Sequence, residues 1–172
     1  MSFATESIQH ACTAQATIAS PLGPLLLART AKGLAGAWFE DQEHHPGPLA
    51  APEVPDDPLL RATVEQFDAY FAGHEFAFDM PLDLLGTPFQ CNVWQALLGI
   101  AAGETRSYGD IAKQLGSPRA TRAVGSAVGR NPLSVIVPCH RVIGNSGALT
   151  GYAGGMQRKR ALLVLEGVEV SA

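Results

Sequence analysis

Cys139 lies at the centre of the sequence Pro138-Cys139-His140-Arg141-Val142, whose residue types could carry out nucleophilic chemistry. A cysteine reacts as its thiolate, which a nearby base or positive charge favours, and His140 and Arg141 supply one of each. Consecutive side chains on an extended backbone point in opposite directions. Contact between Cys139 and His140 therefore needs a turn at Pro138 or a bridging water. The motif predicts a reactive thiol whose environment depends on the local turn.

The chain has three cysteines, Cys12, Cys91 and Cys139, at unrelated spacings. An odd number without a Cys-x-x-Cys pair indicates neither a disulfide framework nor a zinc site. Cysteine is also a common small buried residue, and we interpret Cys91 in that structural way. For Cys139 the structural alternative is a buried thiol at the end of a strand, which only the surrounding residues can exclude. A reducing compartment, the cytoplasm, would keep Cys139 as a thiol.

Two short helices are predicted upstream of the motif. Ser107, with Asp110 three residues later, predicts the start of a helix that ends at residue 116, where the sequence has a glycine. Ser117-Pro118 then predicts a second helix over residues 119–128. Two short helices joined by a tight turn form a helix-turn-helix, although an ordinary helical hairpin has the same pattern.

The second of these helices is rich in small residues: Ala120, Ala123, Gly125, Ser126, Ala127 and Gly129. Glycine costs about 1 kcal/mol in a helix interior, so a close approach of the backbone to another surface should offset it. That surface is either the protein's own interior or a narrow groove of DNA. General helix-turn-helix docking would favour the major groove.

Two further helices begin with an N-cap residue followed by proline. Asp57-Pro58 predicts a helix with inward-facing Leu60, Val64, Phe67 and Phe71. Thr87-Pro88 predicts a helix with inward-facing Phe89, Val93, Trp94, Leu97 and Ile100. Apolar runs between turn residues predict strands at residues 16–19, 25–28, 34–39 and 76–80. Residues 40–57 are acidic and proline-rich and predict a loop, in which His44 and His45 are a solvated pair and not metal ligands.

The 172 residues suit two small domains sharing the chain, and we place the boundary after residue 84. Residues 1–83 carry three basic and twelve acidic groups, a formal charge of −9. Residues 84–172 carry nine basic and four acidic groups, a charge of +5. A basic C-terminal domain indicates a polyanionic partner, although two oppositely charged surfaces that attract each other give the same sums. No apolar stretch approaches the roughly 20 residues of a membrane span.

Several motifs around the pentapeptide carry a family resemblance: Arg-Ala-Val-Gly (122–125), Asn131-Pro132, Ile143-Gly144, Gly151-Tyr152-Ala153-Gly154-Gly155 and Leu165-Glu166-Gly167. In this order and spacing, over about residues 86–168, the chain resembles the O6-alkylguanine-DNA alkyltransferases. The resemblance implies an α+β fold, with a small RNase-H-like antiparallel sheet domain (1–84) before a mostly helical domain with a helix-turn-helix (85–172). It also implies a monomer, without cofactor, that transfers an alkyl group from O6-alkylguanine, and from O4-alkylthymine, in double-stranded DNA to Cys139.

The same resemblance assigns roles to individual residues. Cys139 accepts the alkyl group, His140 reaches it through water, and Glu166 orients His140. Asn131 ties the cysteine turn to the recognition helix, and Tyr108 faces guanine N3. The flipped base is then held by the Tyr152 hydroxyl, the Ala153 amide, the carbonyls of Cys139 and Val142, and a loop that Gly154 allows to approach closely.

The helix of small residues is implied to enter the minor groove, with Arg122 filling the gap that the flipped base leaves. Its other implied DNA contacts are Arg119, Thr121, Ala123, Gly125 and Ser126. The chain departs from the family pattern at Ala161 and Leu165, which concerns the packing of the last helix. Some members bind zinc in the N-terminal domain, but Thr30 and Ala35 stand at those positions and cannot ligate it, so we predict no metal.

Other function classes remain open at this point. A lesion-binding protein that flips the base without reacting would not need Cys139. A helix-turn-helix transcription regulator would need neither the cysteine nor a base pocket. A Cys-His hydrolase would show a hydrolase motif, and the chain has none.

Overall fold

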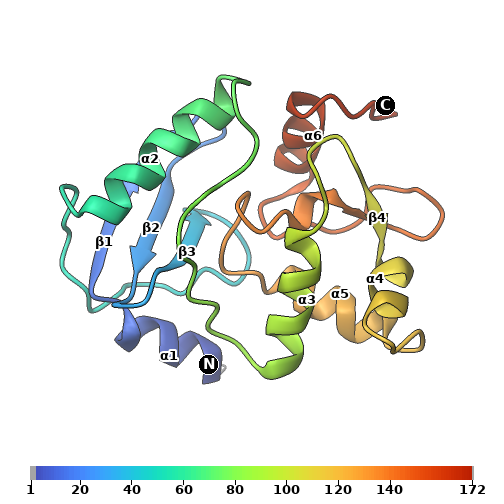
Figure 1. Ribbon diagram of the computed structural model, residues 1–172, viewed down its shortest axis with the longest axis horizontal. Helices are drawn as coiled ribbons and strands as arrows, with labels where there is room; N and C mark the ends of the chain where they lie inside the picture. Colours follow the sequence, from blue (N-terminus) through green and yellow to red (C-terminus); the bar gives the residue numbers. More distant parts are fainter. Residues whose placement is uncertain (1–2, 172) are drawn as a thin grey trace. The chain divides into compact units, whose positions relative to one another are not determined.

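Three apolar segments form an antiparallel sheet in the order β1-β2-β3. The computed structural model describes residues 3–171, and its strands here are β1 (Ala14–Ile18), β2 (Leu25–Arg29) and β3 (Leu34–Phe39). In Figure 1 they are the blue arrows, with β2 in the middle. Three of the four predicted strands are therefore confirmed. Gly36 in β3 has to be glycine, because a Cβ there would lie 1.8 Å from the ring of Trp38.

Helix α1 (Phe3–Ala11) was not predicted from the sequence. Its Ile8, together with Cys12, packs against Ala28, Ala35 and Trp38 of the sheet. A helix this short is difficult to predict from its own residues, because its stability comes from this packing and not from helix propensity.

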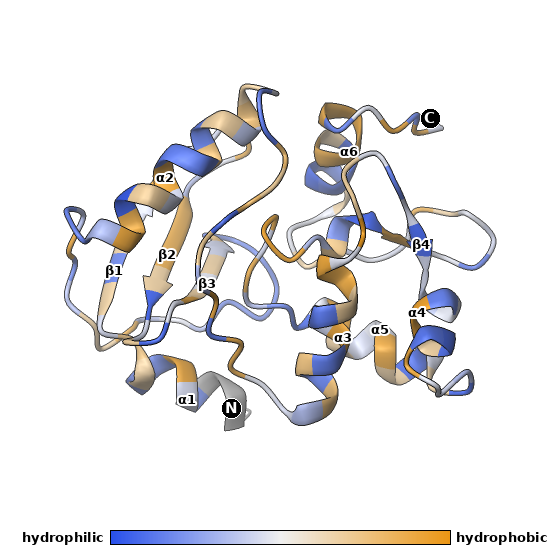
Figure 2. Cartoon of the chain, in the orientation of Figure 1, coloured by the Kyte–Doolittle hydropathy of each residue, from blue (hydrophilic) through white to orange (hydrophobic). Residues whose placement is uncertain are grey.

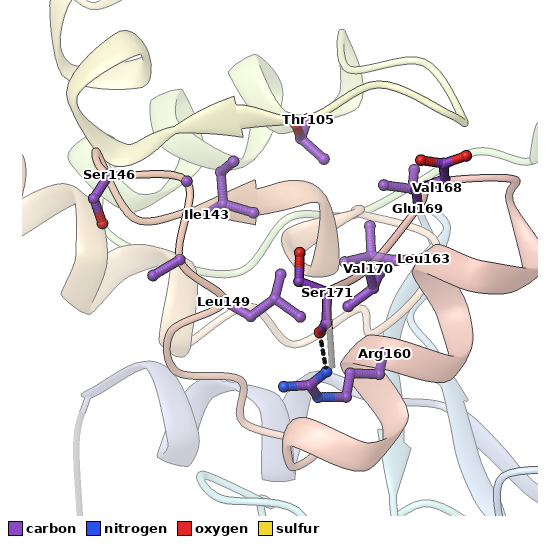
Figure 3. A pocket seen from close by; sticks show the side chains of 12 residues that line it. Thr105, Ile143, Ser146, Leu149, Arg160, Leu163, Val168, Glu169, Val170 and Ser171 are labelled. Carbon is purple, nitrogen blue, oxygen red and sulfur yellow. Dashed lines mark hydrogen bonds between the residues drawn. The ribbon is translucent and has the colours of Figure 1, made fainter.

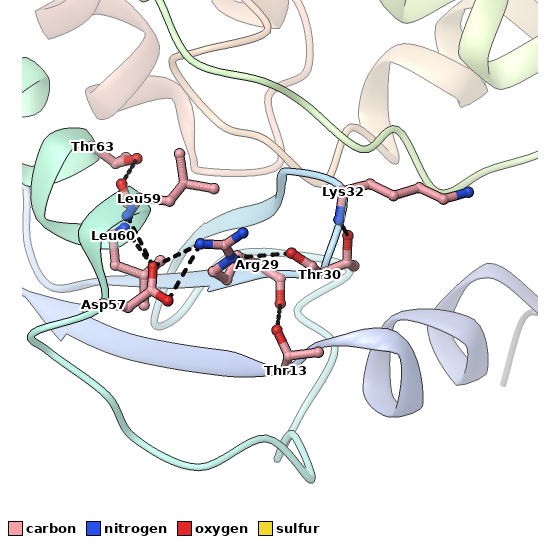
Figure 4. Close-up of polar contacts among 8 residues, drawn as sticks. All are labelled: Thr13, Arg29, Thr30, Lys32, Asp57, Leu59, Leu60 and Thr63. Atoms are coloured by element: carbon pink, nitrogen blue, oxygen red, sulfur yellow. Dashed lines mark hydrogen bonds and ion pairs between the residues drawn. The ribbon is translucent and has the colours of Figure 1, made fainter.

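Helix α2 (Pro58–Phe71) begins where Asp57-Pro58 predicted. Asp57 accepts hydrogen bonds from the amides of Leu59 and Leu60 at 3.0 and 3.1 Å, and Arg29 of β2 pairs with the same carboxylate at 3.1 Å (Figure 4). These contacts hold the pKa of Asp57 below its usual value, against the opposing effect of burial. The predicted inward face was partly wrong. The buried residues are Leu60, Thr63, Phe67 and Tyr70, while Val64 and Phe71 are only half-buried.

No strand forms at residues 76–80, so that prediction was wrong. The aromatic residues that suggested it cover α2 instead: the rings of Phe76 and Phe78 lie 5.4 and 5.5 Å from that of Tyr70. Edge-to-face and tilted aromatic contacts of this kind stabilise packing without any backbone ladder. The sheet is extended by two isolated parallel bridges, between Leu34 and Leu82 and between Gln15 and Glu53.

The acidic segment 40–57 contains no helix or strand, as predicted. Two glutamine side chains tie it to the rest of its unit. Gln9 of α1 donates to the Pro46 carbonyl at 2.6 Å, and Gln15 of β1 donates to the Ala51 carbonyl at 2.5 Å. The loop is therefore anchored along its length despite having no regular structure.

The described chain divides into two compact units between Gly86 and Thr87. The second unit contains α3 (Pro88–Leu98), β4 (Arg106–Ser107), α4 (Tyr108–Gln114), α5 (Thr121–Gly129), the 3-10 turn η1 (Cys139–Arg141), β5 (Val142–Ile143) and α6 (Met156–Leu165). Figure 2 shows apolar and polar residues interspersed along its helices. No helix among residues 3–171 is long and apolar enough to cross a membrane.

Helix α3 begins at Pro88, as Thr87-Pro88 predicted, and Thr87 and Gln90 exchange hydrogen bonds in a capping box that was not predicted. Val93, Trp94, Leu97 and, just beyond the helix, Ile100 are buried as predicted, but Phe89 is 36% exposed. Phe89 lies in the first turn of the helix. Trp94 donates its indole N–H to the Ala127 carbonyl at 2.9 Å and so ties α3 to α5.

Helices α4 and α5 form the predicted pair. Ser107 caps α4, with Asp110 reciprocating, at 3.0 and 3.1 Å. The chain leaves α4 through Gly116, whose φ of +73° is favourable only for glycine. The predicted start of α5 was two residues too early: Ser117-Pro118 forms a turn, closed by the Ala120 amide donating to the Ser117 carbonyl at 2.8 Å, and the helix begins at Thr121.

Candidate active site

The cysteine turn is built by the residues before it. Pro138 has φ −80° and ψ 63°, and the Cys139 amide donates to the Val137 carbonyl at 2.8 Å, which together make an inverse γ-turn. The chain then turns through η1 and pairs β5 with β4 in parallel, Val142 opposite Arg106 and Ile143 opposite Ser107. The pairing brings the start of α4 next to the cysteine turn.

The buried side chain of Asn131 contacts the thiol of Cys139. The side chain of Cys139 is almost inaccessible, with the residue 5% exposed. Asn131 donates to its Sγ at 3.2 Å, and the same amide group donates to the Val137 carbonyl at 2.8 Å. The Asn131 Oδ1 accepts from the Leu133 amide at 2.9 Å. Asn131 therefore joins the end of α5 to both sides of the cysteine turn.

His140 does not point at Cys139. Its Nε2 lies 2.8 Å from Oε1 of Glu166, and both side chains are fully buried. Arg141 grips the same carboxylate with two N–H groups, at 2.7 and 2.8 Å, and donates a third to the Ile100 carbonyl at 2.5 Å. An ionised carboxylate only accepts hydrogen bonds, so Nε2 of His140 carries the proton and Nδ1 keeps its lone pair. That Nδ1 atom is buried without a partner among residues 3–171.

Lys159 is a site residue that the sequence pattern did not single out. It is completely buried on α6, and its Nζ donates to the carbonyls of Val142, Thr150 and Gly151 at 2.6, 2.8 and 3.3 Å. Burial lowers the pKa of Lys159 to about 8, and a negative charge on Cys139, when it is present, opposes the shift. At neutral pH the ammonium is therefore mostly charged. The sequence held one indication that Lys159 is buried. It shares a helix face with the apolar Leu162 and Leu163, three and four residues later.

The thiol and the imidazole are both neutral in this environment. Burial raises the pKa of Cys139 above its ordinary value, and the Asn131 hydrogen bond and the Lys159 charge lower it in part. Burial likewise lowers the pKa of His140, against the effect of Glu166. Nδ1 of His140 makes no hydrogen bond to Sγ, so a proton transfer that creates the thiolate needs a bridging water.

Tyr108, the first residue of α4, contacts the loop that follows β5. Its hydroxyl donates to the Thr150 carbonyl at 3.5 Å, a long contact, and burial raises its pKa so that it remains a hydrogen-bond donor. Tyr152 and Ala153 are half-buried and Gly154 is buried. The Val142 carbonyl, predicted to contact the base, already accepts from Lys159, and a carbonyl has a second lone pair to offer.

The predicted DNA contacts lie on and around α5. Arg122, Ala123 and Ser126 are exposed, Thr121 and Gly125 are half-buried, and Arg119 is exposed in the preceding turn. The inward face consists of Val124, Ala127 and Val128. A Cβ on Gly125 would lie 3.8 Å from the ring of Tyr108, an ordinary contact, and one on Gly129 would meet nothing within 4 Å. Internal packing therefore does not require either glycine.

Comparison with known proteins identifies the chain along most of its length. The family pattern described as 6-O-methylguanine DNA methyltransferase, ribonuclease-like domain, matches residues 14–84, and its DNA binding domain matches residues 88–168. The chain belongs to this methyltransferase family. The two matches fall within the two structural units, and the second contains Cys139, His140 and Glu166.

Relatives in the family are similar over nearly their whole length. A Mycobacterium tuberculosis methylated-DNA–protein-cysteine methyltransferase is 55% identical over 150 residues, covering 87% of this chain and 90% of the relative. One from Methanosarcina acetivorans is 49% identical, covering 86% and 94%. The crystal structure of M. tuberculosis OGT in complex with DNA has a TM-score of 0.81 and 52% identity, covering 90% of this chain and 92% of that one.

The second unit also contains an open cavity of about 420 Å³ that none of the predicted site residues lines (Figure 3). Its walls come from β5, the loop after it, α6 and the C-terminal segment, and Arg160 donates to the Ser171 carbonyl across one side at 2.8 Å. Among residues 3–171, no three His, Cys, Asp or Glu side chains are grouped so as to hold a metal ion.

Stability should fall in mild acid because of His140. Its pKa lies below the ordinary value of 6.5 in the folded protein, so the unfolded chain binds a proton first as the pH drops. The contribution is complete above pH 6.5 and is lost as the pH falls towards the folded pKa, by up to about 1.4 kcal/mol per pH unit. Urea unfolding from pH 7.5 to 5 should be less pH-dependent in His140→Gln, and unchanged in His74→Gln at an exposed position. Equal slopes in all three proteins would contradict a buried neutral His140.

Replacing Lys159 with methionine should slow reaction of Cys139 about tenfold at pH 7, because the nearby ammonium favours the thiolate. The lysine loses its charge above its pKa of about 8. The rate ratio between wild type and Lys159→Met should therefore shrink as the pH rises through that value. The reaction with a thiol reagent, followed by mass spectrometry from pH 6.5 to 9.5, measures this ratio, with Lys32→Met as the control. A constant ratio would mean that Lys159 acts only through packing.

Proposed function

We propose that this protein repairs alkylated DNA by transferring a methyl or other small alkyl group from O6 of guanine in double-stranded DNA to Sγ of Cys139, once per molecule. The observation that carries the proposal is the environment of Cys139. Its buried thiol accepts a hydrogen bond from Asn131, and the next residue, His140, is hydrogen-bonded to Glu166. Proteins at about half identity carry the name methylated-DNA–protein-cysteine methyltransferase, which supports the reaction class.

The reaction needs one proton to move before the bond exchange. Nδ1 of His140 takes the Sγ proton through a bridging water, and Glu166 stabilises the imidazolium through Nε2. The thiolate attacks the alkyl carbon, the new S–C bond forms as the C–O6 bond breaks, and the electron pair remains on the guanine. The proton ends on the base, which leaves as ordinary guanine. The product thioether has no thiolate to expel, so turnover stops after one transfer.

The base must leave the duplex before its O6 substituent can reach a buried thiol. We infer that the flipped guanine is held by the Tyr108 hydroxyl at N3, by the Tyr152 hydroxyl and the Ala153 amide at O6, and by the carbonyls of Cys139 and Val142 at its amino group. Gly154 lies between these groups and α6, where a small residue permits close approach. Hydrogen bonds to N3 and O6 stabilise the charge that develops on the leaving base.

We infer that α5 is the element that contacts DNA, through its exposed Arg122, Ala123 and Ser126 and the flanking Arg119. Small side chains suit a narrow minor groove, and the two glycines of α5 are not needed for internal packing. The solved structure of M. tuberculosis OGT in complex with DNA, at 52% identity, supports DNA as the partner. Since the reaction needs a free thiol, we place it in a reducing compartment, the cytoplasm.

The decisive experiment is mass spectrometry of the intact protein, and of its peptides, after incubation with a duplex containing one O6-methylguanine. The expected result is a single added methyl on the peptide that contains Cys139, saturating at one per protein. Selective binding to the lesion without a mass change would make this a recognition protein. Binding governed by DNA sequence, regardless of the lesion, would make it a transcription regulator.

Arg122→Ala should slow repair of duplex DNA by at least about tenfold, while reaction with free O6-benzylguanine changes less than about twofold. The reason is that Arg122 fills the stack only when a base has been removed from it, and unstacking costs a few kcal/mol. Single-turnover rates with both substrates measure the difference. Arg61→Ala, an exposed arginine on α2, serves as the control. Equal slowing with both substrates would contradict the gap-filling role.

A further inference from the structure

The loop of residues 144–151, which follows β5, holds Tyr108 at two separate points. Asn145 Oδ1 accepts from the amide of Gly109, the residue after Tyr108, at 3.0 Å. Thr150 accepts from the Tyr108 hydroxyl with its carbonyl at 3.5 Å. One contact fixes the backbone that carries the tyrosine, and the other lies at the far end of its side chain.

Asn145 acts as a second cap on α4. Ser107 accepts from the amide of Asp110, the third helical residue, and Asn145 accepts from the amide of the second, Gly109. Both are amides without a partner inside the helix. The fit is close, since a Cβ on Gly109 would lie 2.9 Å from Asn145 Oδ1. Tyr108, the first helical residue, is thus set between two capping side chains from different segments.

The two contacts on the tyrosine differ in strength. A 3.5 Å hydroxyl contact is weak, whereas the 3.0 Å amide contact has normal length. The Thr150 carbonyl also accepts from Lys159 at 2.8 Å, so it keeps a partner when the tyrosine hydroxyl leaves. The hydroxyl can therefore exchange Thr150 for another acceptor at little cost, while Asn145 holds the backbone in place.

Little apolar packing fixes this loop. Asn145, Ser146, Gly147 and Ala148 are exposed, and residues 146–149 line the open cavity on the side shown in Figure 3. Within the loop, the Gly144 amide donates to the Ala148 carbonyl at 2.8 Å and closes a tight turn. The position of the loop relative to α4 thus depends on its polar contacts. Among these contacts, Asn145 contributes a side-chain acceptor to the backbone of α4.

We propose that Asn145 is a positioning residue for alkyl transfer, which holds Tyr108 aimed at the flipped base through the first turn of α4. The inference rests on the proposed function, in which the Tyr108 hydroxyl leaves Thr150 and donates to guanine N3. Asn145 touches neither the base nor the thiol in this scheme. Its effect passes through the tyrosine.

Single-turnover transfer rates with a duplex containing O6-methylguanine, at saturating protein, test this. Asn145→Ala should react about fivefold more slowly, the effect of one lost hydrogen bond, with an unchanged Kd for the duplex. Asn145→Asp keeps the acceptor at a helix N-terminus and should restore the rate. In a Tyr108→Phe background, Asn145→Ala should cause no further loss. Ser146→Ala, the next residue of the same exposed turn, is the matched control.

Three results would overturn the inference: a normal rate in Asn145→Ala, a full further loss in the Tyr108→Phe background, or no rescue by Asn145→Asp. The second and third would make Asn145 a purely structural cap, and a fall in Tm matching the loss of rate would identify that case. If wild type itself transfers no methyl, it is the proposed function that fails, which the wild-type arm of the same assay reveals.

Discussion

Cys139→Ala is expected to transfer no alkyl group at all, while its affinity for a duplex containing O6-methylguanine stays within about threefold of wild type. The thiol is the only proposed acceptor, so no residual rate is expected. The residue is 5% exposed, so the loss of its side chain should remove no DNA contact. A truncated buried cysteine costs about 1 kcal/mol, which leaves the domain folded.

The experiment pairs mass spectrometry with a binding titration. Cys91→Ala on α3 is the matched control, because Cys91 is a half-buried cysteine in the same unit and should be dispensable. The control should gain one methyl, as wild type does. A methyl found on Cys139→Ala would place the acceptor elsewhere. Loss of DNA binding in that variant, with an unchanged Tm, would mean that the cysteine serves the interface and not the chemistry.

Glu166→Gln is expected to lower the free energy of unfolding by about 3 kcal/mol and Tm by about 10 °C. The carboxylate is the partner of two buried groups, His140 at 2.8 Å and the Arg141 guanidinium at 2.7 Å. The amide of glutamine keeps the shape of the side chain but leaves the Arg141 charge without a counterion. Its NH2 group would also face N–H donors of His140 or Arg141, which need an acceptor. Transfer should also slow by about a hundredfold, because the imidazolium formed on His140 loses its stabilising charge.

Thermal unfolding and single-turnover transfer measure the two effects separately. Glu169→Gln removes the same charge three residues later, at an exposed position, and should change neither quantity by a measurable amount. A Glu166→Gln protein as stable as wild type would show that the buried network contributes nothing net. A slow but stable variant would confine the role of Glu166 to the chemistry.

Helix boundaries that depend on neighbouring residues could be predicted from the sequence. Asp57-Pro58, Thr87-Pro88 and Ser107 each start a helix where expected, since the capping side chain and the amides it serves are at most three residues apart. The turn Ser117-Pro118 carries the same residue types, yet α5 begins two residues later. Here the amide of Ala120 closes a turn with the Ser117 carbonyl. The local residue pattern does not distinguish a turn of this kind from the first turn of a helix.

Which side of an element is buried depends on what packs against it. The inward stripe of α2 lies one residue away from the predicted positions at Thr63 and Tyr70, because the aromatic residues of 76–80 wrap over Tyr70. Those same residues have the composition of a strand but pair with no other strand. The spacing of apolar residues predicts how wide the buried face of a helix is. Which residues lie at its centre depends on the segment that packs against the helix.

The candidate site divides in the same way. Its individual residues could be named from the motif and the family resemblance, but their contacts could not. Arg141 and Glu166 are separated by 25 residues, and Lys159 lies 17 residues from the carbonyl of Val142 that it binds. These pairs exist only because η1 and α6 pack together. The apolar neighbours of Lys159 on its helix face indicate burial only weakly, since the flanking Arg158 and Arg160 are basic too and are half-buried and exposed.

The close fit around the thiol has a consequence for the protein after it has reacted. A methyl group on Sγ would occupy space in a core where Asn131 lies 3.2 Å from the sulfur, and the amide that links α5 to the cysteine turn would have to move. Overpacking of this kind costs about 1–3 kcal/mol. The alkylated chain is then a less stable molecule than the one that began the repair. Since a chain cannot be reused, the expected loss of stability would shorten the lifetime of a molecule that has already done its work.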